Sequence, residues 1–284
     1  MPDIHIVVDS TANVSPSMLS AHPNLHVVSL AVMMGGQEWP EERISPQELF
    51  AAVAAGKDHP KTSQPSPGDF SRVVGPLIQD GNDVIIITLS GALSGTLQSA
   101  KTAASIVGSN RIWVVDSGTT AIGMVKMAEW ALTEAARGTA AEIIVSSLKE
   151  RQRCTRTMFV PGTLEYLHKG GRIGGAAALI GTIFQIKPIL YLVEGKVAVL
   201  DKVRTRQRAI ARMIEELRTC ERPAYIGVVQ IEAPDEGEEL GKQISEFYPD
   251  CEISVTSGGS VLGTHLGPGL LGIIYQESLK EDGA

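Results

Sequence analysis

The sequence predicts an α/β protein of two domains: an N-terminal doubly wound parallel-sheet domain and a C-terminal mixed or antiparallel α/β domain. In the first half, short uninterrupted apolar runs alternate with helical patterns, which is typical of parallel strands covered on both faces. In the second half, strand patterns come in pairs between helices, which favours a mixed or antiparallel sheet. We expect domains over residues 1–155 and 156–284, with the boundary near Cys154.

The expected elements follow one another with little interruption. A capping box at Ser45, with Pro46 at the first helical position, marks one helix start. A Glu-Gly pair at 194–195 marks a hairpin turn. Strands are expected at residues 4–8, 25–34, 84–87, 112–115, 186–193, 196–200, 224–231, 252–255 and 270–275. Helices are expected at residues 46–55, from 67 onward, and at 100–106, 120–137, 140–151, 204–218 and 236–247.

The composition argues against several classes of protein. A net charge of −7 and an isoelectric point near 5.4 oppose general nucleic-acid binding, which normally uses a basic face. The start of the chain lacks the pattern of a signal peptide, and no apolar run reaches the ~20 residues that span a bilayer. We therefore expect a soluble, cytoplasmic protein without stable membrane insertion. The three cysteines, Cys154, Cys220 and Cys251, are too scattered to indicate a disulfide framework or a metal site.

Two loops rich in hydroxyl side chains lead into expected helix starts, at residues 61–67 and 89–99. Ser and Thr are common helix caps, and capping explains an isolated loop of this kind more often than binding does. Each loop, however, carries more hydroxyls than one cap requires. Because a helix N-terminus also presents unpaired amides, the two loops suit a small anionic group such as a carboxylate.

Polar residues follow three of the expected parallel strands. They are Asp9-Ser10, residues 90–94 and Asp116-Ser117. The carboxyl ends of parallel strands share one edge of the sheet, and ligands bind beyond that edge. The sequence therefore places a binding face there.

Motifs in order along almost the whole chain resemble those of the DegV family. They read Asp-Ser-Thr at 9–11, Thr-Ser-Gln-Pro-Ser at 62–66, Leu-Ser-Gly-Thr at 93–96, Leu-Glu-Tyr-Leu-His-Lys-Gly-Gly-Arg-Ile at 164–173, Ile-Lys-Pro-Ile-Leu at 186–190, Lys-Val-Arg at 202–204 and His-Leu-Gly-Pro-Gly at 265–269. The resemblance implies a two-domain protein that binds a long-chain fatty acid between its domains. It further implies a place in phospholipid metabolism, in which a separate ATP-dependent fatty acid kinase subunit converts the presented carboxylate to an acyl phosphate. The chain itself would then have no catalytic site, metal or cofactor.

Chemistry and resemblance together assign the carboxylate site. The hydroxyls of Thr62 and Ser94 can each donate one hydrogen bond, and the amides of Gly95 and Thr96 can add others. The resemblance assigns His265 to the same site, because imidazole can donate to or pair with an anion near neutral pH.

The acyl chain needs an apolar pocket, and residues 173–184 offer small residues beside larger apolar ones. We expect Ile173, Ala177, Ile180 and Phe184 to line it. Burying a ~16-carbon chain supplies on the order of 12 kcal/mol of transfer energy before the costs of association. A helix packed closely through Gly and Ala explains the same pattern equally well.

A local basic cluster in an acidic protein can meet an acidic or phosphate-bearing partner, so Arg172, Arg204 and Arg206 are candidates for docking the kinase subunit. For the arginines at helical spacing, which continue with Arg208 and Arg212, a solvated helix face is the simpler explanation.

The sequence departs from the usual family pattern at Gly91-Ala92, Leu97, Ala121 and Val125. These positions bear on acyl-chain preference more than on lipid binding itself.

Two other functions compete with lipid binding. The first is a serine hydrolase that uses Ser94 and His265, with Asp9 or Asp116, but the chain has no Gly-x-Ser-x-Gly elbow. The second is a nucleotide-binding enzyme, but neither a P-loop nor a Gly-x-Gly-x-x-Gly loop follows a strand.

Overall fold

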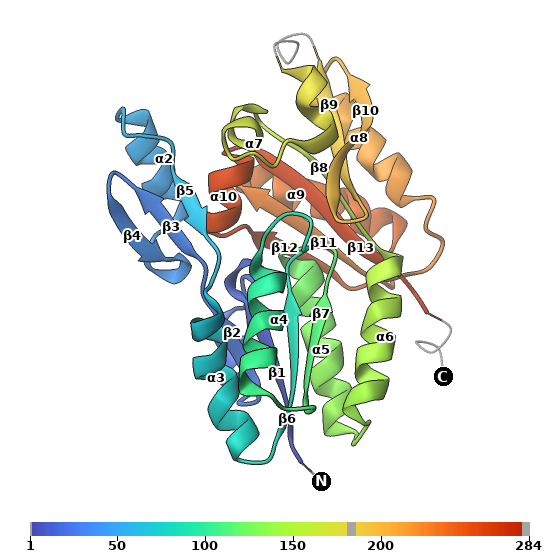
Figure 1. Cartoon of the computed structure of the whole chain (residues 1–284). Helices are drawn as coiled ribbons and strands as arrows, with labels where there is room; N and C mark the ends of the chain where they lie inside the picture. Colours follow the sequence, from blue (N-terminus) through green and yellow to red (C-terminus); the bar gives the residue numbers. More distant parts are fainter. Residues whose placement is uncertain (1, 181–185, 280–284) are drawn as a thin grey trace. The chain divides into compact units, whose positions relative to one another are not determined.

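Parallel strands form the main sheet of the first of two units in the computed structural model, which describes residues 2–180 and 186–279 (Figure 1). The strand order is β2-β1-β6-β7, so β6 pairs with β1 on one side and β7 on the other. This unit comprises the chain up to Ala31 and Ser63–Arg153. Its elements are β1 (Ile4–Asp9), a 3-10 helix (Ser10–Ala12), α1 (Pro16–Ala21), β2 (Leu25–Val28), α3 (Pro67–Gln79), β6 (Asp83–Thr88), α4 (Thr96–Val107), β7 (Ile112–Asp116), α5 (Ile122–Ala136) and α6 (Ala141–Cys154).

Helices cover both faces of this sheet. Val7 and Ile86 face α3 and α4, where Phe70 is completely buried. Because strand side chains alternate between faces, Ile6 and Ile85 point the other way, toward α5, and both are also completely buried. Burial on both faces explains why these strands read as continuous apolar runs. The expected doubly wound parallel sheet is confirmed.

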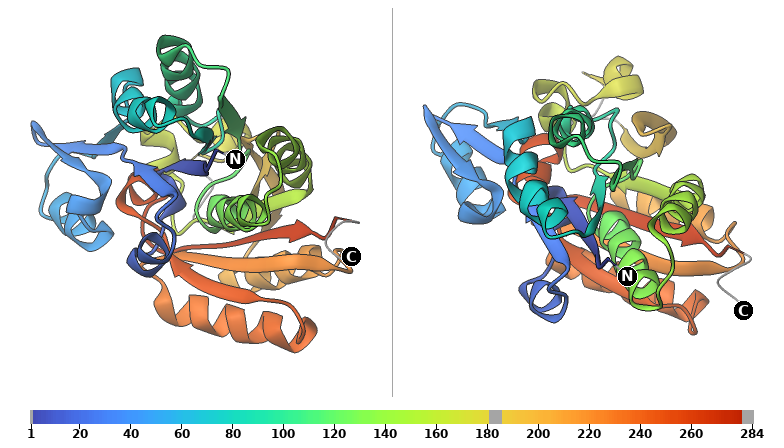
Figure 2. Two further views of the ribbon diagram at one scale, coloured as in Figure 1. Left: turned by 90° about the horizontal axis from the view of Figure 1, so that it is seen from below. Right: turned by 60° about the horizontal axis from the view of Figure 1, so that its bottom comes forward.

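The second unit contains a mixed sheet in the order β10-β9-β8-β13-β11-β12, as expected. β11 and β12 are parallel, and the other neighbours are antiparallel. Helices α8 and α9 pack on the same face of the sheet and contribute Met213, Leu217 and Ile244 to its core (Figure 2). The elements from Cys154 onward are β8 (Thr155–Val160), α7 (Glu165–Lys169), a 3-10 helix (Gly174–Leu179), β9 (Lys187–Val193), β10 (Lys196–Val203), α8 (Arg206–Leu217), β11 (Pro223–Ile231), α9 (Pro234–Phe247), β12 (Ile253–Ser257), α10 (Ser260–Leu266) and β13 (Leu270–Glu277).

An early segment, Val32–Thr62, belongs to this second unit and interrupts the first, whereas we expected two continuous ranges. Two contacts tie it to α10. The carboxylate of the buried Glu41 accepts a hydrogen bond from the Val261 amide at 3.0 Å, and a Cβ atom at Gly263 would lie 3.2 Å from Phe50 Cζ. The elements of the segment are β3 (Ala31–Met34), β4 (Gln37–Pro40), a 3-10 helix (Glu41–Arg43), α2 (Pro46–Ala54) and β5 (Lys61–Ser63), with the strands in the order β4-β3-β5.

The prediction of a single strand over residues 25–34 is wrong. The chain turns at Ser29-Leu30, so β2 joins the parallel sheet and β3 joins the small sheet of the second unit. The Ser10 hydroxyl accepts the Leu30 amide at 2.9 Å and stabilises this break. An apolar pattern alone does not reveal a partner of this kind.

The predicted capping box at Ser45 is present, and a second capping box begins another helix. Ser45 and Glu48 form a complete capping box at the start of α2, and Ser66 and Asp69 form another at the start of α3. The hydroxyl of Ser66 is therefore used for capping. Across the residues that the structure describes, no helix is both long enough and apolar enough to cross a bilayer.

Candidate functional site

His265 and Thr62 lie 203 residues apart in the chain but form a hydrogen bond in the second unit. His265 is in the last turn of α10, and its Nε2 atom lies 2.7 Å from Thr62 Oγ1. The Nδ1 atom is buried and has no hydrogen-bond partner among the described residues. A Cβ atom at Gly170 would collide with Nδ1, so only glycine fits beside the ring at that position.

This geometry selects the tautomer of His265. A neutral imidazole carries one N–H, and buried N–H groups without an acceptor are rare because they cost free energy. Nδ1 has no acceptor, whereas Nε2 faces the Thr62 hydroxyl oxygen. The proton therefore belongs on Nε2, from which it is donated to Thr62 Oγ1. The hydroxyl hydrogen of Thr62 is then left to be donated to another acceptor.

The charge state of His265 agrees with a neutral ring that donates a hydrogen bond to Thr62. Burial is the main cause that lowers the pKa of His265 to about 4, and electrostatic interactions with Arg172 and His59 act in the same direction. The ring is consequently neutral near pH 7. It can donate or accept a hydrogen bond there, but it does not offer a positive charge to an anion.

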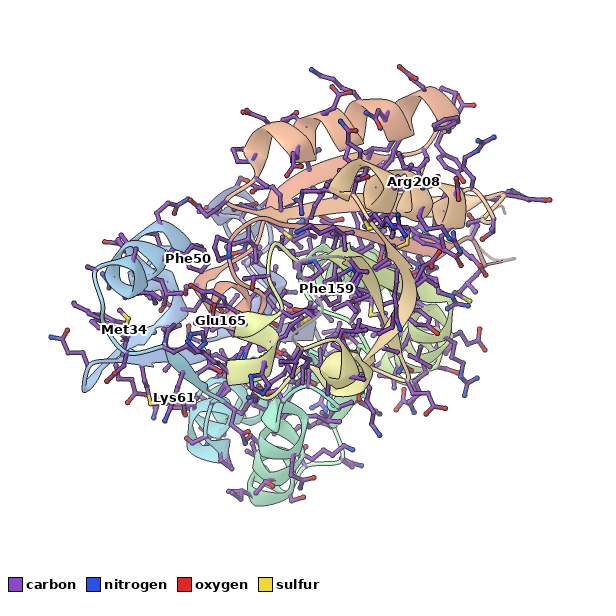
Figure 3. The ribbon with its side chains drawn as sticks, turned by 90° about the horizontal axis from the view of Figure 1, so that it is seen from above. Met34, Phe50, Lys61, Phe159, Glu165 and Arg208 are labelled. Atoms are coloured by element: carbon purple, nitrogen blue, oxygen red, sulfur yellow. The ribbon has the colours of Figure 1, made fainter. Side chains whose placement is uncertain are left out.

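Two aromatic residues beside His265 received no role from the sequence. His59 packs edge-on against Tyr166, with ring centroids 4.8 Å apart, and hydrogen-bonds with the backbone of Thr264. Phe50, which projects from α2 (Figure 3), packs against the same Tyr166 ring at 5.7 Å. The one available signal for His59 is its place just before the hydroxyl-rich loop.

The loop after β6 supplies the second group of expected ligands, in the first unit. Ser94 Oγ lies 2.9 Å from Thr96 Oγ1 and accepts the Thr96 amide at 3.3 Å. That amide, which we expected to bind a ligand, is thus already engaged. Gly95 is the N-cap of α4 and supplies no side-chain cap. The amides of the first turn of a helix lack partners within that helix, so this end of α4 favours an anion.

Gly95 also permits close packing in this loop. A Cβ atom at position 95 would collide with the Gln64 side chain, whose Nε2 atom donates to Ser99 Oγ at 3.0 Å. Gln64 belongs to the Thr-Ser-Gln-Pro-Ser motif. The two hydroxyl-rich loops therefore meet in part through Gln64, within the first unit.

The expected acyl-chain residues have different surroundings. Ile173 is buried, Ala177 is exposed, and Ile180 is 46% exposed. Phe184 lies outside the described residues. The segment from Gly174 forms a 3-10 helix, and a Cβ atom at Gly174 would collide with the Val197 carbonyl, so close packing through glycine is present at this position.

The three arginines that are candidates for docking a partner differ in burial and in hydrogen bonding. Arg172 is half-buried, and its Nη1 atom donates to the Gly170 carbonyl at 2.6 Å. Arg204 is exposed. Arg206 makes two parallel hydrogen bonds, each 2.7 Å long, to the carboxylate of Glu236. The structure therefore gives Arg206 a partner on α9.

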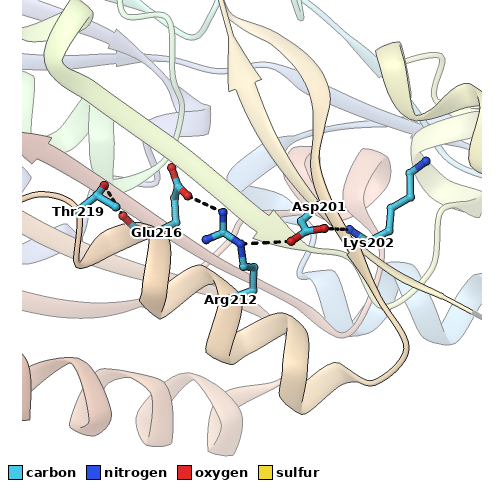
Figure 4. Close-up of polar contacts among 5 residues, drawn as sticks. All are labelled: Asp201, Lys202, Arg212, Glu216 and Thr219. Carbon is cyan, nitrogen blue, oxygen red and sulfur yellow. Dashed lines mark hydrogen bonds and ion pairs between the residues drawn. The ribbon is translucent and has the colours of Figure 1, made fainter.

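Arg212, on the same helix, is also paired. It donates to Asp201 at 3.2 Å and to Glu216 at 2.9 Å (Figure 4). A plain solvated face is thus too simple a description of this helix, because two of its arginines are held by carboxylates.

In the described part of the chain, no group of three or more His, Cys, Asp or Glu side chains is placed to hold a metal ion. Within the described residues, Cys154, Cys220 and Cys251 form no disulfide.

The low pKa of His265 predicts a pH-dependent contribution to stability. An unfolded His titrates near 6.5 and the folded ring near 4, so between these values the unfolded state binds more protons. The contribution is complete above about pH 6.5 and is lost as the pH falls toward 4. The buried Asp9, whose pKa is raised from 3.8 to about 6, acts in the opposite sense.

Comparing the stability of the wild type with that of His265→Gln separates the contribution of His265 from that of Asp9. The free energy of unfolding, measured with urea at several pH values, should show the wild-type advantage over the variant shrinking as the pH falls. Wild-type and variant curves that stay parallel would contradict a neutral, buried His265.

The chain matches known proteins over nearly its whole length. The family described as "Uncharacterised protein, DegV family" matches residues 3–278. A DegV domain-containing protein of Streptomyces coelicolor is 35% identical over 278 residues, which cover 95% of this chain and 97% of that protein. A second, from Halalkalibacterium halodurans, is 33% identical over 280 residues, or 97% of this chain and 99% of that protein.

Solved structures agree with these matches. A DegV family protein from Thermus thermophilus, described as binding fatty acid, is 32% identical with a TM-score of 0.91, covering 97% of this chain and all 100% of that one. DegV from Bacillus subtilis, described as a fatty acid binding protein, is 30% identical with a TM-score of 0.87, covering 98% and 100%. Fold, motifs and these similarities lead to one conclusion: the chain belongs to the DegV family.

Proposed function

We propose that this chain binds a long-chain fatty acid and presents its carboxylate to a separate ATP-dependent kinase subunit, which makes an acyl phosphate. The observation that carries the proposal is the Thr62–His265 pair, which leaves one hydroxyl hydrogen available to an outside acceptor. The Thermus and Bacillus relatives, described as fatty-acid-binding, support the choice of ligand. No cofactor is part of the proposal.

The proposed head-group site uses neutral donors. Thr62 donates its hydroxyl hydrogen and His265 fixes the direction of that donation, while Ser94, Gly95 and Thr96 are the further proposed ligands. Hydrogen bonds to an ionised acceptor are about twice as strong as neutral ones.

In the proposed complex, the apolar tail of the fatty acid supplies most of the binding affinity. Each buried CH₂ group contributes ~0.8 kcal/mol, so a long chain binds strongly even when its head group is merely satisfied. We propose that Ile173, Ala177, Ile180 and Phe184 contact the tail. The exposed Ala177 and Ile180 are apolar surface that a tail would cover.

No observation favours the hydrolase. Ser94 hydrogen-bonds with Thr96 and His265 with Thr62, each within its own unit. A pKa of about 4 also makes His265 a weak base for activating a serine at neutral pH.

The first prediction is that protein purified under native conditions carries one long-chain fatty acid, or takes one up on addition. Mass spectrometry of the intact complex, followed by lipid extraction, measures both the stoichiometry and the chain. Protein that neither carries nor binds a fatty acid would overturn the proposed function.

The second prediction concerns the head-group site. Thr62→Ala and Ser94→Ala should each weaken fatty acid binding by about 1–3 kcal/mol, because a desolvated carboxylate loses a donor. Thr62→Ser keeps the hydroxyl and is the matched control, with affinity close to that of the wild type. Unchanged affinity in the double alanine variant would show that these hydroxyls serve only the fold.

The third prediction concerns the partner. Arg172→Ala should leave fatty acid binding intact but slow acyl phosphate formation by purified chain, fatty acid, Mg-ATP and a cognate kinase subunit. Arg208→Ala removes an exposed arginine of the same unit and serves as the control. Acyl phosphate made without the kinase subunit would refute the division of labour. An equal loss of lipid binding in Arg172→Ala would refute the docking role.

A further inference from the structure

Strand β6 lies between β1 and β7, and each of these neighbours ends in an aspartate. Both carboxylates accept amide hydrogens from the loop that follows β6. Asp9 Oδ2 accepts the Leu89 amide at 2.6 Å, and Asp116 accepts the Gly91 amide at 3.1 and 3.2 Å. The loop that carries Ser94 is thus held near its start from both sides. The proposed function has made no use of either aspartate.

Backbone hydrogen bonds join the same loops. The Ser90 amide donates to the Thr119 carbonyl at 2.9 Å, and the Ala121 amide donates to the Thr11 carbonyl at 3.0 Å. Ala121 adopts a positive φ of 49°, which is uncommon outside glycine. The loops after β1, β6 and β7 therefore form one connected structure within the first unit.

The two aspartates have different environments. Asp9 is completely buried and also accepts the amide and hydroxyl of Thr11, at 3.1 and 2.6 Å. Asp116 is half-buried and also accepts the Gly118 amide at 2.9 Å. Burial raises the pKa of Asp9 to about 6, while its hydrogen bonds from Thr11 and Leu89 act in the opposite direction.

Charged neighbours do not account for the raised pKa of Asp9, which is caused by burial and opposed by the hydrogen bonds. Among the described residues, three elements pack on β1. Strand β6 carries Asp83 at the end of the sheet away from Asp9, and β2 carries His26. Helix α5 carries Glu134 and the ion pair between Lys126 and Glu129, 2.8 Å apart. Asp116, at the end of β7, faces the loop after β6.

We propose that Asp9 and Asp116 are positioning residues that hold the Ser94 loop in the shape required for carboxylate binding, and that Asp9 does so only when ionised. Its oxygens accept hydrogen bonds from the Thr11 and Leu89 amides, which can only donate, and from the Thr11 hydroxyl. A proton on Oδ2 would place a donor against the Leu89 amide, so that bond would be lost and the start of the loop released. This inference rests on the proposed function, because Ser94 matters only if it binds the acid.

The Asp9–Leu89 link is tested without any lipid. In ¹H–¹⁵N spectra recorded from about pH 5 to 8, the Leu89 amide of wild-type protein should titrate with a midpoint near 6. Asp116→Asn should keep this titration, and Asp9→Asn should abolish it. A Leu89 amide that does not titrate in the wild type overturns the inference, even if Asp9→Asn fails to fold.

The effect on binding is tested with a long-chain alkanesulfonate, whose head group stays ionised throughout this pH range, alongside a fatty acid. Asp9→Asn should bind on the order of tenfold more weakly at neutral pH, as expected when a buried amide loses its partner. Wild-type affinity should fall toward this level as the pH drops through 6. His265, with a pKa near 4, titrates below that window.

A double-variant cycle connects the aspartate to its target. In a Ser94→Ala background, Asp9→Asn should cost little further affinity, because the group it positions is gone. Full additivity of the two losses would overturn the positioning role. If neither probe binds the wild type, the proposed function fails, and the Leu89 titration still decides whether Asp9 controls the loop.

Discussion

The hydrogen bond between Thr62 and His265 is the interaction on which this account of the second unit depends. It joins the end of the early segment Val32–Thr62 to α10, the same helix whose start is held by Glu41. The ring reaches this position only because Gly170 has no side chain to obstruct Nδ1. The same hydrogen bond that holds the segment in place therefore also leaves the hydroxyl hydrogen of Thr62 available to another acceptor.

The first unit also offers neutral hydrogen-bond donors, which lie in the loops at one edge of its parallel sheet. Hydroxyls and amides gather at the carboxyl edge of a parallel sheet, and buried or half-buried aspartates hold their loop. The hydrogen bonds given for Thr62, His265, Ser94 and Thr96 are made by neutral groups, and the charge of Arg172 acts on His265 electrostatically. Neutral donors of this kind suit a carboxylate that must be held yet remain accessible to a reaction partner.

Local sequence patterns predicted the parallel sheet, the capping box at Ser45 and the hairpin correctly, because apolar periodicity and capping act over a few residues. They failed where a distant partner decides the outcome. The break at Ser29-Leu30 depends on Ser10, and the pairing of Arg206 depends on Glu236. His59 showed no pattern because its neighbour Tyr166 lies more than a hundred residues away in the chain. The meeting of Thr62 with His265 was expected only through family resemblance.

The tautomer of His265 tests the central claim most directly. Long-range ¹H–¹⁵N spectra of the imidazole at neutral pH distinguish a protonated nitrogen from a bare one. We predict a neutral ring with its proton on Nε2 and a bare Nδ1, so that Thr62 is free to donate to a ligand. A proton on Nδ1, or a charged imidazolium, would contradict it, because Thr62 would then donate to the ring or the site would carry a positive charge.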